Sequence, residues 1–572
     1  MFLFLIQIIF VIKVTLMPLT SSPQPKIPVD FVQPSFGGGI NTSLPPELIA
    51  EDEAQEILNF EFNDDDHLRT RAGVFDWASG FTFPRRITSI HHYQNDLGAS
   101  DVLVTSANKL YKTGTGTVSF SDITGTLSLP NDVFWQWKTY GGLAIGVNGT
   151  APVKYDGTAA HLGGSPPNAS FVEVWNDRVW LVSSADPNVV YGSVLGDPED
   201  WTVGNAAQAV VIDVSKNDGD RITGLYAYKG QLFVFKRRRI YVISALEGTL
   251  ATDVGNLFVE LYAHNVGCVS GFTIQSVFDD VLFLSEQGVV SLASAPLGEL
   301  KTVIVSKKVK ELRQIRKTSN QFGSLVLNEA NQYWIMVPAN LSPRNEDEIY
   351  VLDLRRIQEG VLRWVRFNGK VAGSCATVVT IDGQNIVLIG GTNKKIYSYK
   401  TGLTSDISLW DVGVWDISKW DNVSSNFTFF DDNEAYIKRI RSKAFDFGAQ
   451  FYRKLFHRFG FRITTLSDRI DARFLYFFDN NESLSDFYDF IITKQVRNPL
   501  WDVAKWDVDK WDSSVVDTFP VIRQFNRGPV GRRGINVTFE LSCEQPQGFI
   551  VRHGFLEFAI FGTNRVNEVN VL

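Results

Sequence analysis

The sequence is poor in cysteine and histidine, and this scarcity removes several kinds of site. The chain of 572 residues has three cysteines, Cys268, Cys375 and Cys543, and only seven histidines. The cysteines are odd in number, far apart and without a CxxC pair, so neither a disulfide scaffold nor a zinc site is predicted. The histidines are scattered and no HExxH motif occurs. We therefore expect no metal and no cofactor.

Catalytic motifs are missing from the sequence as well. It contains no P-loop, no GxSxG nucleophile elbow and no SxDxGxxW box of the kind that marks sialidase-like propellers. Three carboxylates, Asp64, Asp65 and Asp66, follow one another in NDDDH. Beside a predicted strand, such a run is more typical of a solvated turn than of a calcium site. The sequence predicts a protein that is not an enzyme.

No apolar run is long enough to span a bilayer. The first 19 residues, MFLFLIQIIFVIKVTLMPL, are largely apolar but have neither a basic n-region nor a small-residue cleavage site. Two of the three methionines, Met1 and Met17, lie in this stretch, so translation from Met17 would remove the run. We interpret residues 1–16 as an apolar leader or a misassigned start, and we expect no membrane association of the mature form.

Composition indicates a globular protein of more than one domain. Apolar residues make up 44% of the chain, aromatic residues 13% and charged residues 21%. A chain of 572 residues exceeds what one hydrophobic core normally serves, so two or three domains are expected. The net charge of -8 argues against a general nucleic-acid coat, although it leaves room for local basic surfaces.

One theme of short alternating strands and turns returns between Arg86 and Gly402. Successive units begin near Arg86, Phe134, Phe171, Ile222, Val269, Phe322 and Ser374, at intervals of 37 to 53 residues. Such units, with almost no helical periodicity, are typical of four-stranded blades. We predict an all-β fold in which residues 81–402 form a β-propeller of about seven blades, closed so that strand edges are covered. A series of β-sandwiches is the alternative.

Two details of the repeat carry further predictions. Tyrosines recur in the third strand of their units, where a ring can fill the wedge between blades; they are Tyr111, Tyr241, Tyr350 and Tyr397. One helix is expected in VSKKVKELRQIRKTS, because its apolar positions share a helical face while the rest is mostly basic. Those positions are Val305, Val309, Leu312 and Ile315.

The regions on either side of the repeat differ from it. Residues 17–80 are predicted to form an N-terminal arm. Residues 403–572 contain strand-like runs without the blade rhythm, such as KLFHRFGFRI, ARFLYFF, INVTFELSC and FLEFAIFG. We expect an antiparallel, β-sandwich-like C-terminal domain.

This C-terminal region also holds two near copies of one unusual segment. LWDVGVWDISKWD covers residues 409–421 and LWDVAKWDVDKWD covers residues 500–512. Their Trp-Asp pairs are five residues apart, whereas WD-repeat propellers show one pair about every 40 to 45 residues. We expect turn-rich inserts whose rings pack together or against a neighbouring subunit. The packing and assembly candidates are Trp410, Trp415, Trp420, Trp501, Trp506 and Trp511.

One segment resembles a known family. Residues 37–74 read GGGINTSLPPELIAEDEAQEILNFEFNDDDHLRTRAGV: a Gly-rich start, a Leu-Pro stretch, acidic residues, ILNFEF, a turn and a basic, Gly-containing ending. This resembles the opening of the tail nozzle proteins, or tail tubular protein B, of short-tailed bacteriophages, and related proteins that stabilise packaged DNA. Residues from Lys443, KAFDFGAQFYRKLFHRFGF, are similar to C-terminal segments of phage tail propellers.

The resemblance implies a structural virion protein of the phage tail, either a nozzle or a head–tail stopper, that retains packaged DNA and opens for ejection. Its implied partners are copies of itself in a homo-oligomeric ring, with six as the candidate number, adaptor or portal-side tail proteins, and double-stranded DNA in the channel. The alternative function is a secreted β-propeller that binds glycans or hydrolyses glycosides. That alternative requires the apolar leader to be a signal peptide.

Two basic clusters are candidates for facing DNA. The first consists of Lys236, Arg237, Arg238 and Arg239; the second contributes Lys307, Lys308, Lys310, Arg313, Arg316 and Lys317. The first cluster lies between two apolar runs, which places it in or beside a hairpin. Phosphate contact is one interpretation of each cluster and ordinary solvation of the surface is the other.

Overall fold

The structure, a computed structural model, describes much of the chain. The described residues are 29–33, 35–78, 80–95, 98, 100–114, 118–203, 209–245, 254–297, 303–315, 319–381, 384–399, 429–448, 454–467, 469–493, 521–524 and 533–560. The leader at 1–16, both Trp-Asp inserts with their six tryptophans, Arg316 and Lys317 lie outside these residues.

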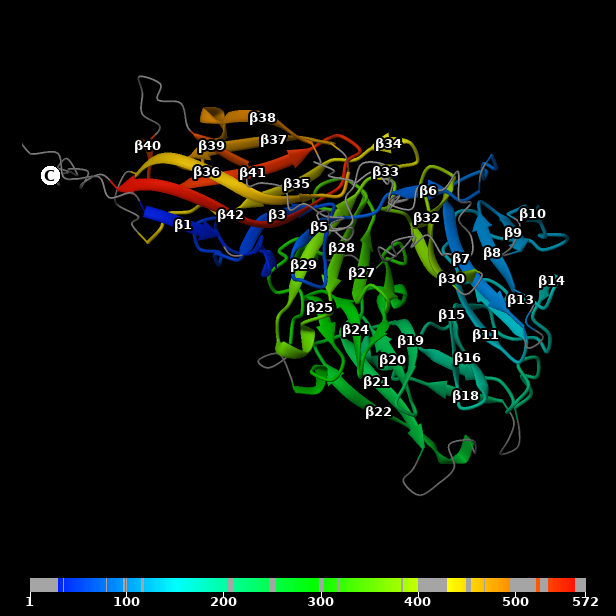
Figure 1. Ribbon diagram of the computed structural model, residues 1–572. Helices are drawn as coiled ribbons and strands as arrows, with labels where there is room; N and C mark the ends of the chain where they lie inside the picture. Colours follow the sequence, from blue (N-terminus) through cyan, green and yellow to red (C-terminus); the bar gives the residue numbers. More distant parts are fainter. Residues whose placement is uncertain are drawn as a thin grey trace, which may run out of the picture.

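Seven antiparallel groups of strands, counted over the described residues, surround one axis and form the blades of a β-propeller (Figure 1). Five of these blades are separate sheets, and the other two are parts of larger sheets. Blades one to three are β7 (Ile87–Gln94), β8 (Ser100–Ser106), β9 (Lys109–Gly114) and β10 (Ser121–Asp122); β11 (Gln136–Tyr140), β12 (Leu143–Val147), β13 (Val153–Tyr155) and β14 (Ala159–His161); and β15 (Ala169–Trp175), β16 (Arg178–Ser183), β17 (Val189–Gly192) and β18 (Val210–Asp213). Blades four and five are β19 (Ile222–Tyr228), β20 (Gln231–Lys236), β21 (Arg239–Ala245) and β22 (Leu257–His264); and β23 (Gln275–Val277), β24 (Asp280–Ser285) and β25 (Gly288–Ser291). Blades six and seven are β26 (Gly323–Leu327), β27 (Gln332–Val337), β28 (Glu348–Asp353) and β29 (Arg363–Asn368); and β30 (Cys375–Ile381), β31 (Gln384–Gly390), β32 (Ile396–Tyr399) and β6 (Val74–Asp76).

The ring is closed by a strand from the N-terminal side of the chain. β6 pairs antiparallel with β32, so blade seven takes its fourth strand from residues that precede blade one. On the inner side, β30 contacts β7, and the Ile87 amide donates to the Gly391 carbonyl at 3.4 Å. One closed ring replaces the alternative of separate sandwiches. We expected the propeller to begin at residue 81. Because β6, at residues 74–76, is a strand of blade seven, the propeller also includes residues before that boundary.

The units that repeat in the sequence correspond to the blades of the propeller. Each predicted unit begins within a few residues of the first strand of a blade. All four predicted tyrosines lie in third strands and are buried. Tyr111 packs in one cluster with Val379 and Leu388 of blade seven, while Tyr241 packs with Phe171 of blade three. We call these apolar contact zones between neighbouring blades the blade seams.

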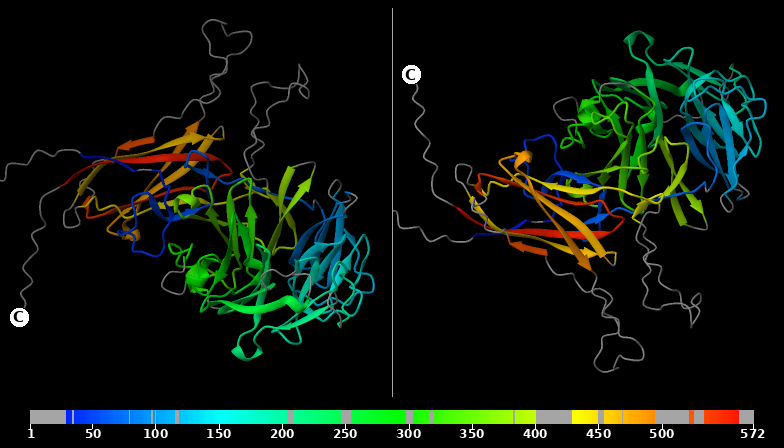
Figure 2. Two further views of the ribbon diagram at one scale, coloured as in Figure 1. Left: turned by 90° about the horizontal axis from the view of Figure 1, so that it is seen from below. Right: turned by 90° about the horizontal axis from the view of Figure 1, so that it is seen from above.

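The C-terminal domain is an antiparallel β-sandwich (Figures 1 and 2). One sheet contains, in order, β38 (Asp486–Thr493), β37 (Arg469–Phe478), β41 (Val537–Cys543), β35 (Lys438–Ser442), β3 (Glu53–Leu58) and β2 (Gly39–Ile40). The other contains β39 (Val521–Gln524) and β40 (Arg533–Gly534), then β36 (Lys454–Thr465), β42 (Phe549–Ile560), β1 (Val29–Gln33) with β5 (Leu68–Thr70), and β4 (Phe60–Phe62). Phe461 and Phe474 meet between the sheets with ring centroids 5.5 Å apart. The predicted strand runs of this region correspond to β36, β37, β41 and β42.

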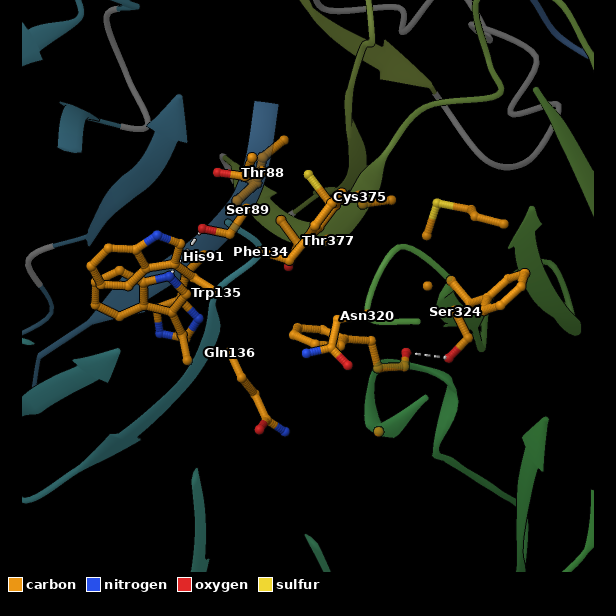
Figure 3. Close-up of a pocket in the computed structure, with 18 of the residues that line it drawn as sticks. Thr88, Ser89, His91, Phe134, Trp135, Gln136, Asn320, Ser324, Cys375 and Thr377 are labelled. Carbon is orange, nitrogen blue, oxygen red and sulfur yellow. Dashed lines mark hydrogen bonds between the residues drawn. The ribbon is translucent and has the colours of Figure 1, made fainter. Parts of the chain in front are cut away.

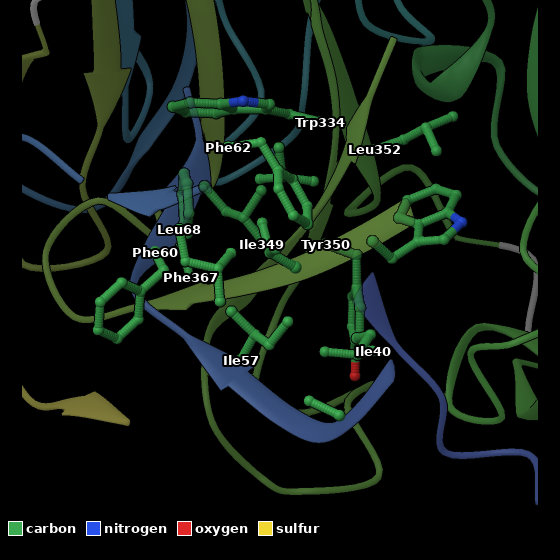
Figure 4. Close-up of a cluster of buried hydrophobic side chains, with 14 of the residues drawn as sticks. Ile40, Ile57, Phe60, Phe62, Leu68, Trp334, Ile349, Tyr350, Leu352 and Phe367 are labelled. Atoms are coloured by element: carbon green, nitrogen blue, oxygen red, sulfur yellow. The ribbon is translucent and has the colours of Figure 1, made fainter. Parts of the chain in front are cut away.

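The N-terminal segment is part of both domains rather than a separate arm. β3 pairs antiparallel with β35 of the sandwich and parallel with β29 of blade six, so one sheet crosses from propeller to sandwich. Figure 4 shows Ile57, Phe60 and Phe62 against Ile349 and Phe367 of blade six, and all five side chains are buried. A short hairpin, β33 (Phe430–Asp431) and β34 (Glu434–Ala435), joins the other side of β6.

The helix predicted between Val305 and Ser319 is wrong for the described part of that stretch. Its four apolar side chains are buried, but the chain forms turns and one 3-10 turn, η5 (Leu312–Gln314). The chain here follows the N-terminal segment instead: the Thr42 amide donates to the Lys308 carbonyl at 2.9 Å. Other 3-10 turns are η1 (Lys216–Asp218), η2 (Val254–Asn256), η3 (Gly271–Thr273), η4 (Ala295–Leu297), η6 (Ile357–Glu359) and η7 (Glu482–Leu484). Within the described ranges, no helix has the length and apolar character needed to cross a membrane.

Candidate functional site

The contact between propeller and sandwich is organised around the carboxylate of Glu56, on β3. Glu56 forms an ion pair with Arg366 of β29, and lies 3.7 Å from Arg344 on the same blade. On its other side Arg439 of β35 approaches to 3.5 Å. One carboxylate from the N-terminal segment therefore bridges arginines of both domains. We call the ion pairs around Glu56 and their extensions the domain junction.

The domain junction extends into each domain through further carboxylates. In blade six, Arg366 also donates to Glu346 at 2.5 Å and to the buried Glu348 at 3.1 Å. In the sandwich, Arg441 of β35 donates to Glu540 of β41 at 2.8 Å and to Glu482 at 2.7 Å. Burial disfavours an unpaired charge, so the removal of one partner leaves another uncompensated.

A second ionic contact holds the closing blade against the N-terminal segment. Arg71 is fully buried and makes a bidentate pair with Asp431 of β33, at 2.6 and 2.9 Å. Its remaining donors reach Asn59 at 2.9 Å and the carbonyl of Asn368 at 3.0 Å. Its guanidinium carbon lies 3.8 Å from the ring centroid of Tyr436. The neighbouring charge of Asp431 raises the pKa of Arg71 despite the opposing effect of burial.

Gly73, two residues after Arg71, lies where the backbone has no room for a side chain. A Cβ atom at this position would lie 1.8 Å from the carbonyl oxygen of Phe430, which is closer than any real contact. The close approach allows β6 to lie beside β33 while Arg71 reaches Asp431. Within the LRTRAGV ending, the ion pair thus explains Arg71 and the backbone contact explains Gly73.

The first basic cluster does not present four free cations. Lys236 is fully buried and its Nζ donates to Asp218 at 2.8 Å, so the prediction that it faces DNA is wrong. It is the last residue of β20 and shares a face with Leu232 and Val234, which point into a blade seam. Arg239 also reaches Asp218, at 3.3 Å.

The other two residues of this cluster share one acidic partner. Arg237 pairs with Glu286 of the neighbouring blade at 2.5 Å, and Arg238 lies 3.4 Å from the same carboxylate. The side chain of Arg238 is 67% exposed, which makes it the most accessible cation of the four.

The second basic cluster is divided between an internal contact and the surface. Lys308 pairs with Glu53 at 2.9 Å and donates to the Gly38 carbonyl at 3.2 Å, so it faces the N-terminal segment instead of solvent. Lys307, Lys310 and Arg313 are exposed. These three residues remain candidates for contact with a phosphate backbone.

Sequence reasoning did not identify the residues of the domain junction. Glu56 lies in an acidic stretch and Arg366 in a blade strand, where each looks like an ordinary surface charge. Their 310-residue separation gives no local signal. Among the described residues, no group of three or more histidine, cysteine or acidic side chains is placed to hold a metal ion.

Comparison with known proteins adds similarity of structure only. No protein-family model matches the chain, and no curated protein matches it. The Neurospora crassa Pan2 WD40 domain is 8% identical, with a TM-score of 0.35 over 59% of this chain and 97% of that domain. YCF48 from Cyanidioschyzon merolae is 11% identical, with a TM-score of 0.36 over 56% of this chain and 97% of that protein.

Proposed function

We propose that the protein is a structural component of the tail of a short-tailed bacteriophage, a nozzle or head–tail stopper that retains packaged DNA and opens for ejection. It would act as a ring of identical copies, with adaptor or portal-side tail proteins as neighbours and double-stranded DNA in the channel. The role is mechanical and needs no catalytic step.

One observation carries this proposal. The segment that resembles tail nozzle proteins, residues 37–74, is the segment that joins propeller to sandwich through Glu56, Arg71 and β3. A subunit in the wall of a pressurised channel must pass load between its domains without sliding. Charge-assisted hydrogen bonds with fixed directions resist such sliding better than apolar contacts alone.

The part of the proposal that concerns DNA now rests on fewer residues. Lys236 and Lys308 have internal partners, and Arg237 and Arg239 are paired with acids of their own surroundings. We propose Arg238, Lys307, Lys310 and Arg313 as the residues that face the channel, since these side chains are exposed; Arg238 is 67% exposed although it lies 3.4 Å from Glu286. Each phosphate contact would release counterions and make DNA retention depend on salt.

The test uses particles that carry K307Q, K310Q and R313Q together. We expect the ring to assemble and DNA to leak faster than from the parent, with a flatter dependence on salt. The control carries R85Q, K109Q and K229Q, which removes the same formal charge from exposed ion pairs elsewhere on the propeller. Equal leakage from both variants and the parent at every salt concentration would reject the DNA contact of Lys307, Lys310 and Arg313.

Location of the protein is tested separately with an antibody in negative-stain images of purified particles. Label at the tail, or at the head–tail joint, is the expected result. Absence of the protein from particles would reject the virion role as a whole.

A further inference from the structure

The propeller contains a cavity on its axis with a volume of about 300 Å³. Inner strands of the blades line it, from β7 and β11 round to β26 and β30. Figure 3 shows Trp135 and His91 on one side of this axial cavity and Ser324 on the other, with Asn320 between them. Small-molecule sites begin at about this volume, so an occupant would be small.

Three chemically distinct side chains from adjacent blades meet at the wall of the axial cavity. Lys138 of β11 pairs with Glu173 of β15 at 2.8 Å. The Lys138 ammonium also lies 5.7 Å from the ring centroid of Tyr226, on β19. Glu173 is almost fully buried, whereas one third of the Lys138 side chain is exposed. A buried acceptor thus lies beside an accessible donor.

The carboxylate of Glu173 is only half satisfied. Its Oε1 accepts from Lys138 and from the Val174 amide at 3.1 Å. Its Oε2 is buried and has no hydrogen-bond partner among the described residues. A buried carboxylate oxygen without a donor is costly, and neither Lys138 nor the backbone satisfies it here. Lys138 keeps further N–H donors, because an ammonium group has three.

The rest of the lining indicates a neutral occupant. Lys138 and Glu173 compensate each other's charge, and burial lowers the pKa of His91 to about 3, so its imidazole is neutral near pH 7. The polar groups around them are uncharged amides and hydroxyls, including Gln136 and Thr377. Oε2 has almost no accessible surface, so a turn of the Glu173 side chain must first bring it to the cavity; a ligand hydroxyl can then donate to Oε2 while its neighbour accepts from Lys138. Adjacent hydroxyls on one small ring meet both needs.

We propose that the axial cavity binds a small, neutral, hydroxyl-rich ligand of monosaccharide size, with Glu173 and Lys138 as its specificity-determining residues. Glu173 accepts from one hydroxyl, Lys138 donates to the adjacent one, and Tyr226 offers an aromatic surface beside them. The inference does not depend on the proposed role in a phage tail.

Saturation-transfer NMR on the full chain tests this inference, with glucose, galactose, N-acetylglucosamine and myo-inositol as probes. We expect at least one probe to bind, and Glu173→Gln to weaken it by about tenfold or more, as expected on loss of a hydrogen bond to a charged group. Lys138→Gln is the second variant, because its partly exposed side chain makes it easier to replace without unfolding. Glu199→Gln is the matched control, since Glu199 pairs with Lys154 at 2.9 Å in a more exposed setting.

Thermal melts establish which variants are folded before binding is compared. Binding that is lost in either folded cavity variant and kept in Glu199→Gln supports the inference. Absence of binding by all four probes would overturn it, and so would equal binding by the wild-type protein and the folded cavity variants.

Discussion

Between neighbouring blades the contacts are mainly apolar, whereas the contact between the propeller and the sandwich adds a network of arginines and carboxylates to its apolar core. The blade seam next to blade four contains Phe171, Leu225 and Ile243, all buried. The domain junction places Glu56 among Arg366, Arg344 and Arg439. Apolar seams tolerate small shifts of register because dispersion has no direction. Paired charges hold two domains in one orientation, at the risk of a large penalty when a partner is lost.

The strongest expected effect comes from the domain junction. Glu56→Gln removes the charge that Arg366 and Arg439 share, and Arg366 is almost fully buried. Arg366 keeps Glu346 and Glu348 in this variant, so we expect a loss of about 3–4 kcal/mol in unfolding free energy, at the lower end of the range for broken buried pairs, measured by denaturant unfolding.

The control for this variant is Glu359→Gln, whose carboxylate pairs with Arg356 in an exposed position. It should leave the denaturation midpoint nearly unchanged, because surface pairs contribute little. If both variants shift the denaturation midpoint by the same amount, the domain junction does not stabilise the fold more than an exposed ion pair does.

A pH effect of intermediate size is expected from Lys438, which is fully buried beside the Tyr436 ring. Burial lowers the pKa of Lys438 to about 8, below its ordinary value of 10.5. Between these two values the unfolded chain binds more protons, so stability should rise with pH, by up to about 3 kcal/mol. Below pH 8 both states hold the proton and this dependence ends.

Lys438→Met should remove this rise from unfolding curves measured between pH 8 and 10.5. A rise of the same size in the variant would assign the effect to other groups.

The smallest effect is expected in the blade seams. Ile243→Val removes one buried methyl group between blades three and four and should cost about 1 kcal/mol. The loss should not change with salt, because no charge is involved. Measurement of both Ile243→Val and Glu56→Gln across a salt series sharpens the comparison: a salt-dependent loss in Ile243→Val would contradict the apolar description of the seams.

The propeller could be predicted from sequence because its information is local and repeated. Each unit carries its own alternating strands, and Tyr111 and Tyr241 mark the same place in different blades. The closing strand β6 has three residues and pairs with a strand more than 300 positions away, so no local pattern places it. The prediction of a separate arm at residues 17–80 therefore missed the strands that this segment adds to both domains.

For the basic clusters too, the sequence did not reveal partners that are distant along the chain. Four cations in a row indicated an exposed surface, but Asp218 and Glu286, which neutralise most of them, come from other turns. For Lys236 a signal was present: it directly follows the apolar run LFVF at residues 232–235, all of which is buried. The axial cavity had no signal in sequence, because Lys138, Glu173 and Tyr226 come together only when the blades form a ring.

The closure of the ring by β6 also sets an order for biosynthesis. Residues 74–76 leave the ribosome long before 396–399, their partners in β32. At about 5–20 residues per second, the early strand waits for roughly tens of seconds with its pairing edge uncovered. Blades one to six can form in sequence during this interval, but the ring cannot close. Chaperone binding or aggregation would therefore compete with folding mainly before blade seven is translated. The pairing of β6 with β32, which closes the ring, is a slow step because it joins distant parts of the chain.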